Sequence, residues 1–94
     1  MSSIIHPCEK LLELGPSALT DEELLAILIG SGHKGKSAKE IAKELLDNYY
    51  SIPGLMGRKL SDLMKIKGLK EMKTSRIVAA FEIARRVIKA IEKE

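Results

Sequence analysis

The residues whose spacing best fits a known chemistry lie in the segment GSGHKGKS, residues 30–37. Gly30, Gly35, Lys36 and Ser37 match the P-loop pattern G-x-x-x-x-G-K-[ST], in which backbone N–H groups and a lysine hold the phosphates of a nucleotide. A P-loop also needs a buried strand before the glycines, within a parallel sheet. Whether this segment can bind a nucleotide therefore depends on the elements on either side of it.

The segment before the glycines is predicted to be a helix. Residues 20–23, TDEE, form a capping box in which Thr20 accepts from a first-turn N–H and Glu23 reaches back. The apolar run LLAILI continues that helix without a turn. The chain is also too short for a doubly wound sheet, and no apolar run ends in an aspartate that could help to hold Mg²⁺. We therefore reject the P-loop and expect no nucleotide and no other cofactor.

The rest of the chain is also predicted to be helical, so the expected fold class is all-α. A second capping box, Ser37 with Glu40, opens an amphipathic helix, and Ser61 is expected to cap a short one. Residues 51–57 should form one irregular turn. The expected compact bundle has about five helices, over residues 7–14, 21–29, 38–49, about 61–66 and about 71–92. All 94 residues should form a single domain.

The expected core is aliphatic, because the chain has only one Phe, two Tyr and no Trp. The helix at 21–29 is apolar on nearly all sides and should be central. The last helix carries an apolar stripe at helical spacing, made of Ile77, Phe81, Ala84, Ile88 and Ile91. The residues expected to meet in one core are Leu24, Leu28, Ile41, Leu45, Ile77, Phe81 and Ala84.

Charge is distributed unevenly along the chain. Residues 1–47 contain 5 Lys or Arg and 8 Asp or Glu (5 − 8 = −3), whereas residues 48–94 contain 11 and 5 (11 − 5 = +6). This uneven distribution of charge suggests a basic surface that faces an anionic partner. The alternative is a solvated surface whose lysines only keep the protein in solution.

The helices alternate with glycine turns in a weak internal repeat of two helix-hairpin-helix units, at about residues 20–50 and 60–92. Each hairpin should place the free N–H groups of a helix start beside lysines, as a modest anion site. The candidate phosphate-contacting residues are Gly32, Lys34, Gly35, Lys36 and Ser37 in the first hairpin, and Lys67, Gly68, Leu69, Lys70, Lys73 and Arg76 in the second. We expect these cations to converge on one face.

The second hairpin resembles the helix-hairpin-helix motif, which binds the DNA backbone through hairpin N–H groups without sequence specificity. Ile66, Gly68 and Leu69 match its apolar-x-G-apolar-G pattern, and Thr74 takes the place of its small residue. Lys70 stands where the second glycine is usual. If that position required a positive φ, a lysine there would cost about 1 kcal/mol.

A larger part of the chain resembles the N-terminal region of the bacterial RadC family. The stretches KLLELGP, LTDEELLAILI and GKS occur in this order, and the similarity covers about residues 7–88. The resemblance implies a link to DNA repair. Members usually continue into a JAB-type metallopeptidase-like domain, whose H-x-H zinc ligands do not occur here. The resemblance therefore implies that the chain is either the N-terminal part of a longer protein or a member that lacks the second part. That missing domain would be a partner.

No arrangement of a nucleophile and a base is found, so the chain is not expected to be an enzyme. His6 and Cys8 could donate to a metal, but we expect them to lie in a disordered N-terminus. Asp21, Glu22 and Glu23 are explained by helix-start preference.

One cysteine, no signal peptide and no bilayer-length apolar stretch predict a cytoplasmic protein without membrane contact. The predicted function is a non-catalytic module that binds the DNA phosphate backbone. The alternative is a protein-interaction or regulatory domain for an attached metallopeptidase-like domain.

Overall fold

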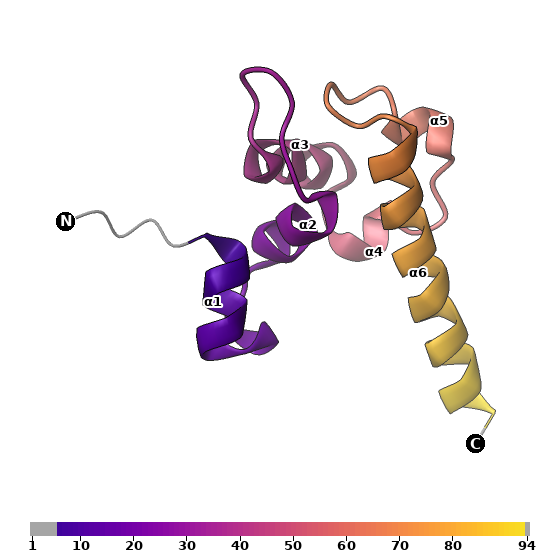
Figure 1. Ribbon diagram of the computed structural model, residues 1–94. Coiled ribbons are helices and arrows are strands. Elements are labelled where there is room, and N and C mark those ends of the chain that lie inside the picture. The colour runs from indigo at the N-terminus through magenta and orange to yellow at the C-terminus, as the bar shows by residue number, and fades with distance from the viewer. Residues whose placement is uncertain (1–5, 94) are drawn as a thin grey trace.

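The computed structural model describes residues 6–93 and is all-α, as predicted (Figure 1). Within this range the chain forms no β-strand and six helices: α1 (Pro7–Leu14), α2 (Asp21–Ile29), α3 (Ala38–Tyr49), α4 (Ile52–Leu55), α5 (Leu60–Leu63) and α6 (Glu71–Glu92). A short 3₁₀ turn, Pro16–Ala18, joins α1 to α2. None of the described helices combines the length and the apolar character that crossing a membrane requires.

The helices pack around α2, which is the central element, as its apolar sequence predicted. It contacts α1, α3 and α6, while α4 packs on α3 and α5 on the start of α6. In Figure 1, α1 and α6 lie on opposite sides of α2, and the loops before α3 and before α6 lie at the same end of the molecule. The two helix-hairpin-helix units therefore pack against each other through the contact of α2 with α6.

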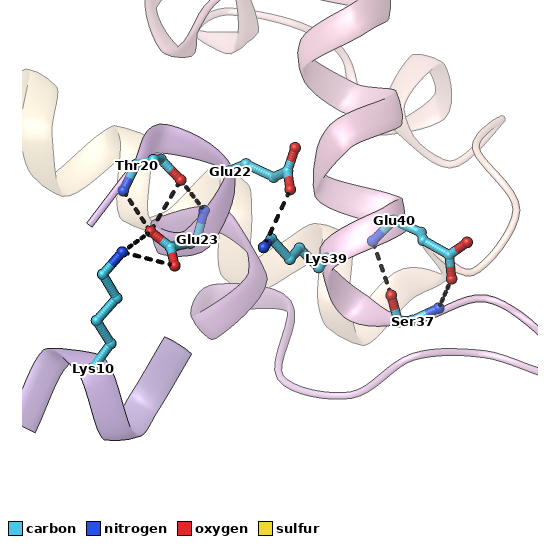
Figure 2. Close-up of polar contacts among 7 residues, drawn as sticks. All are labelled: Lys10, Thr20, Glu22, Glu23, Ser37, Lys39 and Glu40. Carbon is cyan, nitrogen blue, oxygen red and sulfur yellow. Dashed lines mark hydrogen bonds and ion pairs between the residues drawn. The ribbon is translucent and has the colours of Figure 1, made fainter. Parts of the chain in front are cut away.

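Both predicted capping boxes are present (Figure 2). Thr20 Oγ1 accepts from the Glu23 N–H at 3.2 Å, and Glu23 Oε1 accepts from the Thr20 N–H at 2.9 Å. The same carboxylate binds Lys10 Nζ of α1 at 3.1 and 3.2 Å, so the cap of α2 also holds α1 in place. The second box joins Ser37 and Glu40, with distances of 2.8 and 3.1 Å.

Two expectations about helix starts are wrong. The N-cap of α5 is Lys59 and not Ser61, because the amides of Asp62 and Leu63 donate to the Lys59 carbonyl, and burial of Leu63 sets this register. His6 and Cys8 are not disordered: Cys8 is in α1, and its N–H donates to His6 Nδ1 at 3.2 Å, which makes His6 the N-cap. Residues 1–5, for which disorder was also expected, lie outside the described residues.

The core is one aliphatic cluster between α2, α3 and the first half of α6. Its buried members are Leu25, Ala26, Ile29, Ile41, Ala42, Leu45, Leu55, Leu63, Ile66, Leu69 and Ile77. Leu28 and Phe81 are half-buried at its edge. The predictions for Ile41, Leu45 and Ile77 are therefore confirmed.

The predictions for Leu24 and Ala84 are wrong, because both side chains are exposed. Leu25, Ala26 and Ile29 form the buried face of α2, and Leu24 lies outside it. The second half of α6 continues past the other helices, as Figure 1 shows. Only the first half of the predicted apolar stripe on α6 packs against the other helices.

The different environments of the two halves of α6 can be tested with one pair of variants. Ile77→Ala should lower the free energy of unfolding by about 2–5 kcal/mol, because it leaves a cavity among fully buried side chains. Ile88→Ala, on the same stripe but 49% exposed, should change it by less than about 0.5 kcal/mol. Urea denaturation of both variants provides the measurement. Equal losses would contradict the described course of α6.

The capping network should appear in the pH dependence of stability. The Thr20 N–H, and then Lys10, lower the pKa of the Glu23 carboxyl in the folded protein. Ionised Glu23 therefore stabilises the fold above its unfolded pKa of about 4.3, and this contribution disappears as the pH falls through the lower, folded pKa.

We expect Glu23→Gln to be less stable than wild type at pH 7, and the two stabilities to converge between about pH 5 and pH 3. Glu13→Gln, at an exposed position of α1, is the matched control and should follow the wild type. A constant difference between Glu23→Gln and wild type across this range would contradict the linkage.

Candidate nucleic-acid interface

The first hairpin, residues 30–37, connects α2 to α3 through a tight turn. His33 and Lys36 exchange two backbone hydrogen bonds of 2.8 and 2.7 Å, which leaves Lys34 and Gly35 at the tip. Gly35 has φ +70°, a conformation that glycine adopts without steric cost. Gly32 is needed for another reason: a Cβ there would collide with the Lys36 carbonyl oxygen.

The second hairpin, residues 64–70, is a turn anchored by two buried side chains. The Leu69 N–H donates to the Ile66 carbonyl at 3.0 Å, and both side chains enter the core. Lys67 and Gly68 occupy the centre of the turn, with Lys67 exposed and Gly68 at φ +101°. Burial of Ile66 and Leu69 thus leaves Lys67, which lies between them in the turn, pointing outward.

The two hairpins are in direct contact. A Cβ on Gly68 would lie 2.6 Å from Ile41 Cδ1 of α3 and 3.3 Å from the Cβ of His33 in the first hairpin. Lys36 Nζ donates to the Lys67 carbonyl at 3.2 Å and forms an ion pair with Glu44. The hydrogen bond from Lys36 and the close approach at Gly68 therefore hold the two hairpins side by side. Both hairpins lie at the same end of the molecule in Figure 1.

Two further cations from the start of α6 lie at the C-terminal end of α2. Lys73 Nζ donates to the carbonyls of Ser31 (2.5 Å) and Gly32 (3.2 Å). The Arg76 guanidinium lies beside Gly30, whose Cβ, if present, would be 3.3 Å from it. A helix C-terminus has unpaired carbonyls and a partial negative charge, so these positions are electrostatically favourable.

The two helix starts differ in how they are capped. The N–H of Ser37 already donates to Glu40, and the Ser37 hydroxyl accepts from the Glu40 N–H, so the start of α3 is satisfied internally. The start of α6 has no side-chain cap; its N-cap is Lys70. Lys70 has φ −105°, so the positive φ that would have made a lysine unfavourable there does not occur.

The structure thus divides the predicted site residues into groups. Lys34, Lys67, Lys70 and Arg76 are exposed, and within residues 6–93 none forms an ion pair. Lys36, Ser37 and Lys73 have the internal partners described above. The glycines shape the loops, and Leu69 is a core residue whose side chain cannot reach a ligand.

Sequence reasoning missed Glu44 as the partner of Lys36. Glu44 is one helical turn beyond Glu40 on α3, at the spacing that places two side chains on one face, and Lys36 is paired with it. The pairing reduces the positive charge that the first hairpin offers. Lys36 also bridges the loops, so the P-loop-like lysine has a structural contact, and the run before its glycines is confirmed as helix α2.

The contact between the hairpins predicts a difference between two glycines. Gly68→Ala should destabilise the fold by about 2–4 kcal/mol, because the added methyl collides with buried Ile41 in addition to straining the backbone. Gly35→Ala, the matched control, has open space at its Cβ and should cost only the backbone term of about 1–2 kcal/mol. Thermal denaturation of both measures the difference, and equal losses would contradict close packing.

The described fold defines a class: an all-α domain of two helix-hairpin-helix-like units that share one core. The family described as UPF0758 N-terminal matches residues 2–75 of the chain. The chain therefore belongs to the UPF0758 family and represents its N-terminal region, which confirms the resemblance to the RadC-like N-terminal region.

Three relatives illustrate the similarity. UPF0758 proteins from Methylibium petroleiphilum, Leptothrix cholodnii and Burkholderia cenocepacia are 43%, 42% and 40% identical over 87%, 94% and 88% of this chain. The matched regions span 37%, 40% and 32% of those proteins, so the chain corresponds to well under half of each. No solved structure is a significant match.

Proposed function

We propose that this domain is a non-catalytic module that binds the phosphate backbone of DNA without sequence specificity. The observation that carries the proposal is the exposed, uncapped start of α6 with Lys67 and Lys70 beside it. An uncapped helix start offers N–H donors and a partial positive charge, both of which favour an anion. The resemblance to RadC links this activity to DNA repair.

The kind of group on this surface supports backbone recognition. Backbone N–H groups and lysine ammonium groups contact phosphates, which position a protein on nucleic acid but carry no sequence information. Lys34 at the tip of the first hairpin adds a cation next to the second hairpin. The first hairpin should contribute less, because Glu40 and Glu44 already partner its helix start and Lys36.

The proposal is tested by titrating DNA into the protein at several salt concentrations. The logarithm of affinity should fall linearly with the logarithm of salt, by about 0.9 for each phosphate neutralised on duplex DNA. Lys34→Ala, Lys67→Ala and Lys70→Ala should each weaken binding to all base sequences alike and flatten that slope by about one.

Lys89→Ala is the matched control, because it removes an exposed lysine from the far half of α6 and should leave the slope unchanged. Lys36→Ala and Lys73→Ala are unsuitable first variants, since both would also break contacts between the hairpins. If the three hairpin variants bind like wild type, this surface is structural. The domain would then be better described as an interaction or regulatory domain of a longer protein.

A further inference from the structure

The second half of α6 carries an apolar face that nothing in the described residues covers. Ile83, Val87, Ile88 and Ile91 are 65%, 51%, 49% and 65% exposed. Their spacing of i, i+4, i+5 and i+8 places them on one side of the helix, which is the pattern of a face that packs against another element. We call these four residues the α6 face.

A cleft of about 420 Å³ lies next to the α6 face, toward the body of the domain. Its apolar walls include Leu55, Met56, Val78 and Phe81. Phe81 is half-buried and lies on the same stripe of α6 as Ile88, so the cleft adjoins the edge of the α6 face that Ile88 forms. A partner that lies along α6 could insert an apolar side chain here.

A second copy of the chain fits this surface poorly. The flanks of the α6 face are basic, with Arg85 on one side and Arg86 on the other, while Glu82 is already bound to both arginines at 2.7–2.9 Å. Two copies paired through the face would bring these cations together. The exposed parts of four aliphatic side chains also fall well short of the roughly 800 Å² per partner that a standard stable interface buries.

A tethered partner avoids both difficulties. Covalent linkage raises the effective concentration to the millimolar range, so a small interface can be occupied. The family's N-terminal region matches residues 2–75 and stops before the α6 face. The relatives are more than twice as long as their matched regions, which cover 37–41% of the first five, so they contain a large amount of further polypeptide.

We propose that the α6 face and the adjoining cleft are the docking surface for the polypeptide that follows this N-terminal region in the longer UPF0758 proteins. The docking surface on that polypeptide would be apolar with carboxylates at its rim, opposite Arg85 and Arg86. This proposal does not depend on DNA binding, because none of the hairpin residues takes part in it.

The first experiment uses the 94-residue chain and the triple variant Ile83→Gln, Val87→Gln, Ile91→Gln. Sedimentation velocity should show a monomer for both, and their helical circular dichroism should be alike because the replaced side chains are exposed. A wild-type dimer that the triple variant abolishes would identify a second copy as the occupant and overturn the proposal.

The second experiment extends the chain with the polypeptide that follows the matched region in the Methylibium petroleiphilum relative. Amide hydrogen exchange at residues 83–91 should be slower in the extended protein than in the 94-residue chain, by about tenfold or more. The triple variant should remove this protection. A control variant, Leu12→Gln, Leu14→Gln, Met72→Gln, changes three exposed apolar residues elsewhere and should retain it. Unchanged exchange on extension, or protection that survives the triple variant, would overturn the proposal.

Discussion

Close packing at Gly68 is the constraint on which the candidate interface depends. The turn of the second hairpin approaches α3 so closely that a Cβ would lie 2.6 Å from Ile41 Cδ1. This approach brings the Lys67 carbonyl within reach of Lys36 and places the start of α6 against the end of α2. Two loops that are far apart in sequence become one surface, joined by close packing at Gly68 and by lysine side chains that donate to backbone carbonyls.

The lysines of this surface have two kinds of role, which composition alone cannot separate. Lys73 contacts the Ser31 and Gly32 carbonyls of the first hairpin, and Lys36 bridges the hairpins, whereas Lys67 and Lys70 face solvent. The number of lysines predicts the sign of the surface charge. It does not predict which ammonium groups remain available to a ligand. That distinction depends on tertiary contacts such as the Lys36–Glu44 pair.

Local signals in the sequence were sufficient for the four longer helices, α1, α2, α3 and α6. The capping boxes at Thr20 and Ser37 place two helix starts correctly, because each box involves residues only three apart. Packing partners were harder to predict. The apolar stripe on α6 is periodic through Ile91, yet the packed core ends near Phe81. Periodicity identifies an apolar face of a helix but does not show what covers that face. Leu24 was misplaced for the same reason, since α2 is apolar on most sides.

The length of α6 separates the two surfaces that we assign to this domain. Its 22 residues span about 33 Å at 1.5 Å per residue. The uncapped start lies at the hairpins, and the exposed α6 face begins about 18 Å further along, at Ile83. Figure 1 shows the hairpin loops beside the start of α6 and the second half of the helix extending away from them. A partner docked on the far half would leave the hairpins open. One continuous helix would therefore hold the proposed phosphate-binding surface at a fixed distance and orientation from the polypeptide that follows this region in the longer UPF0758 proteins.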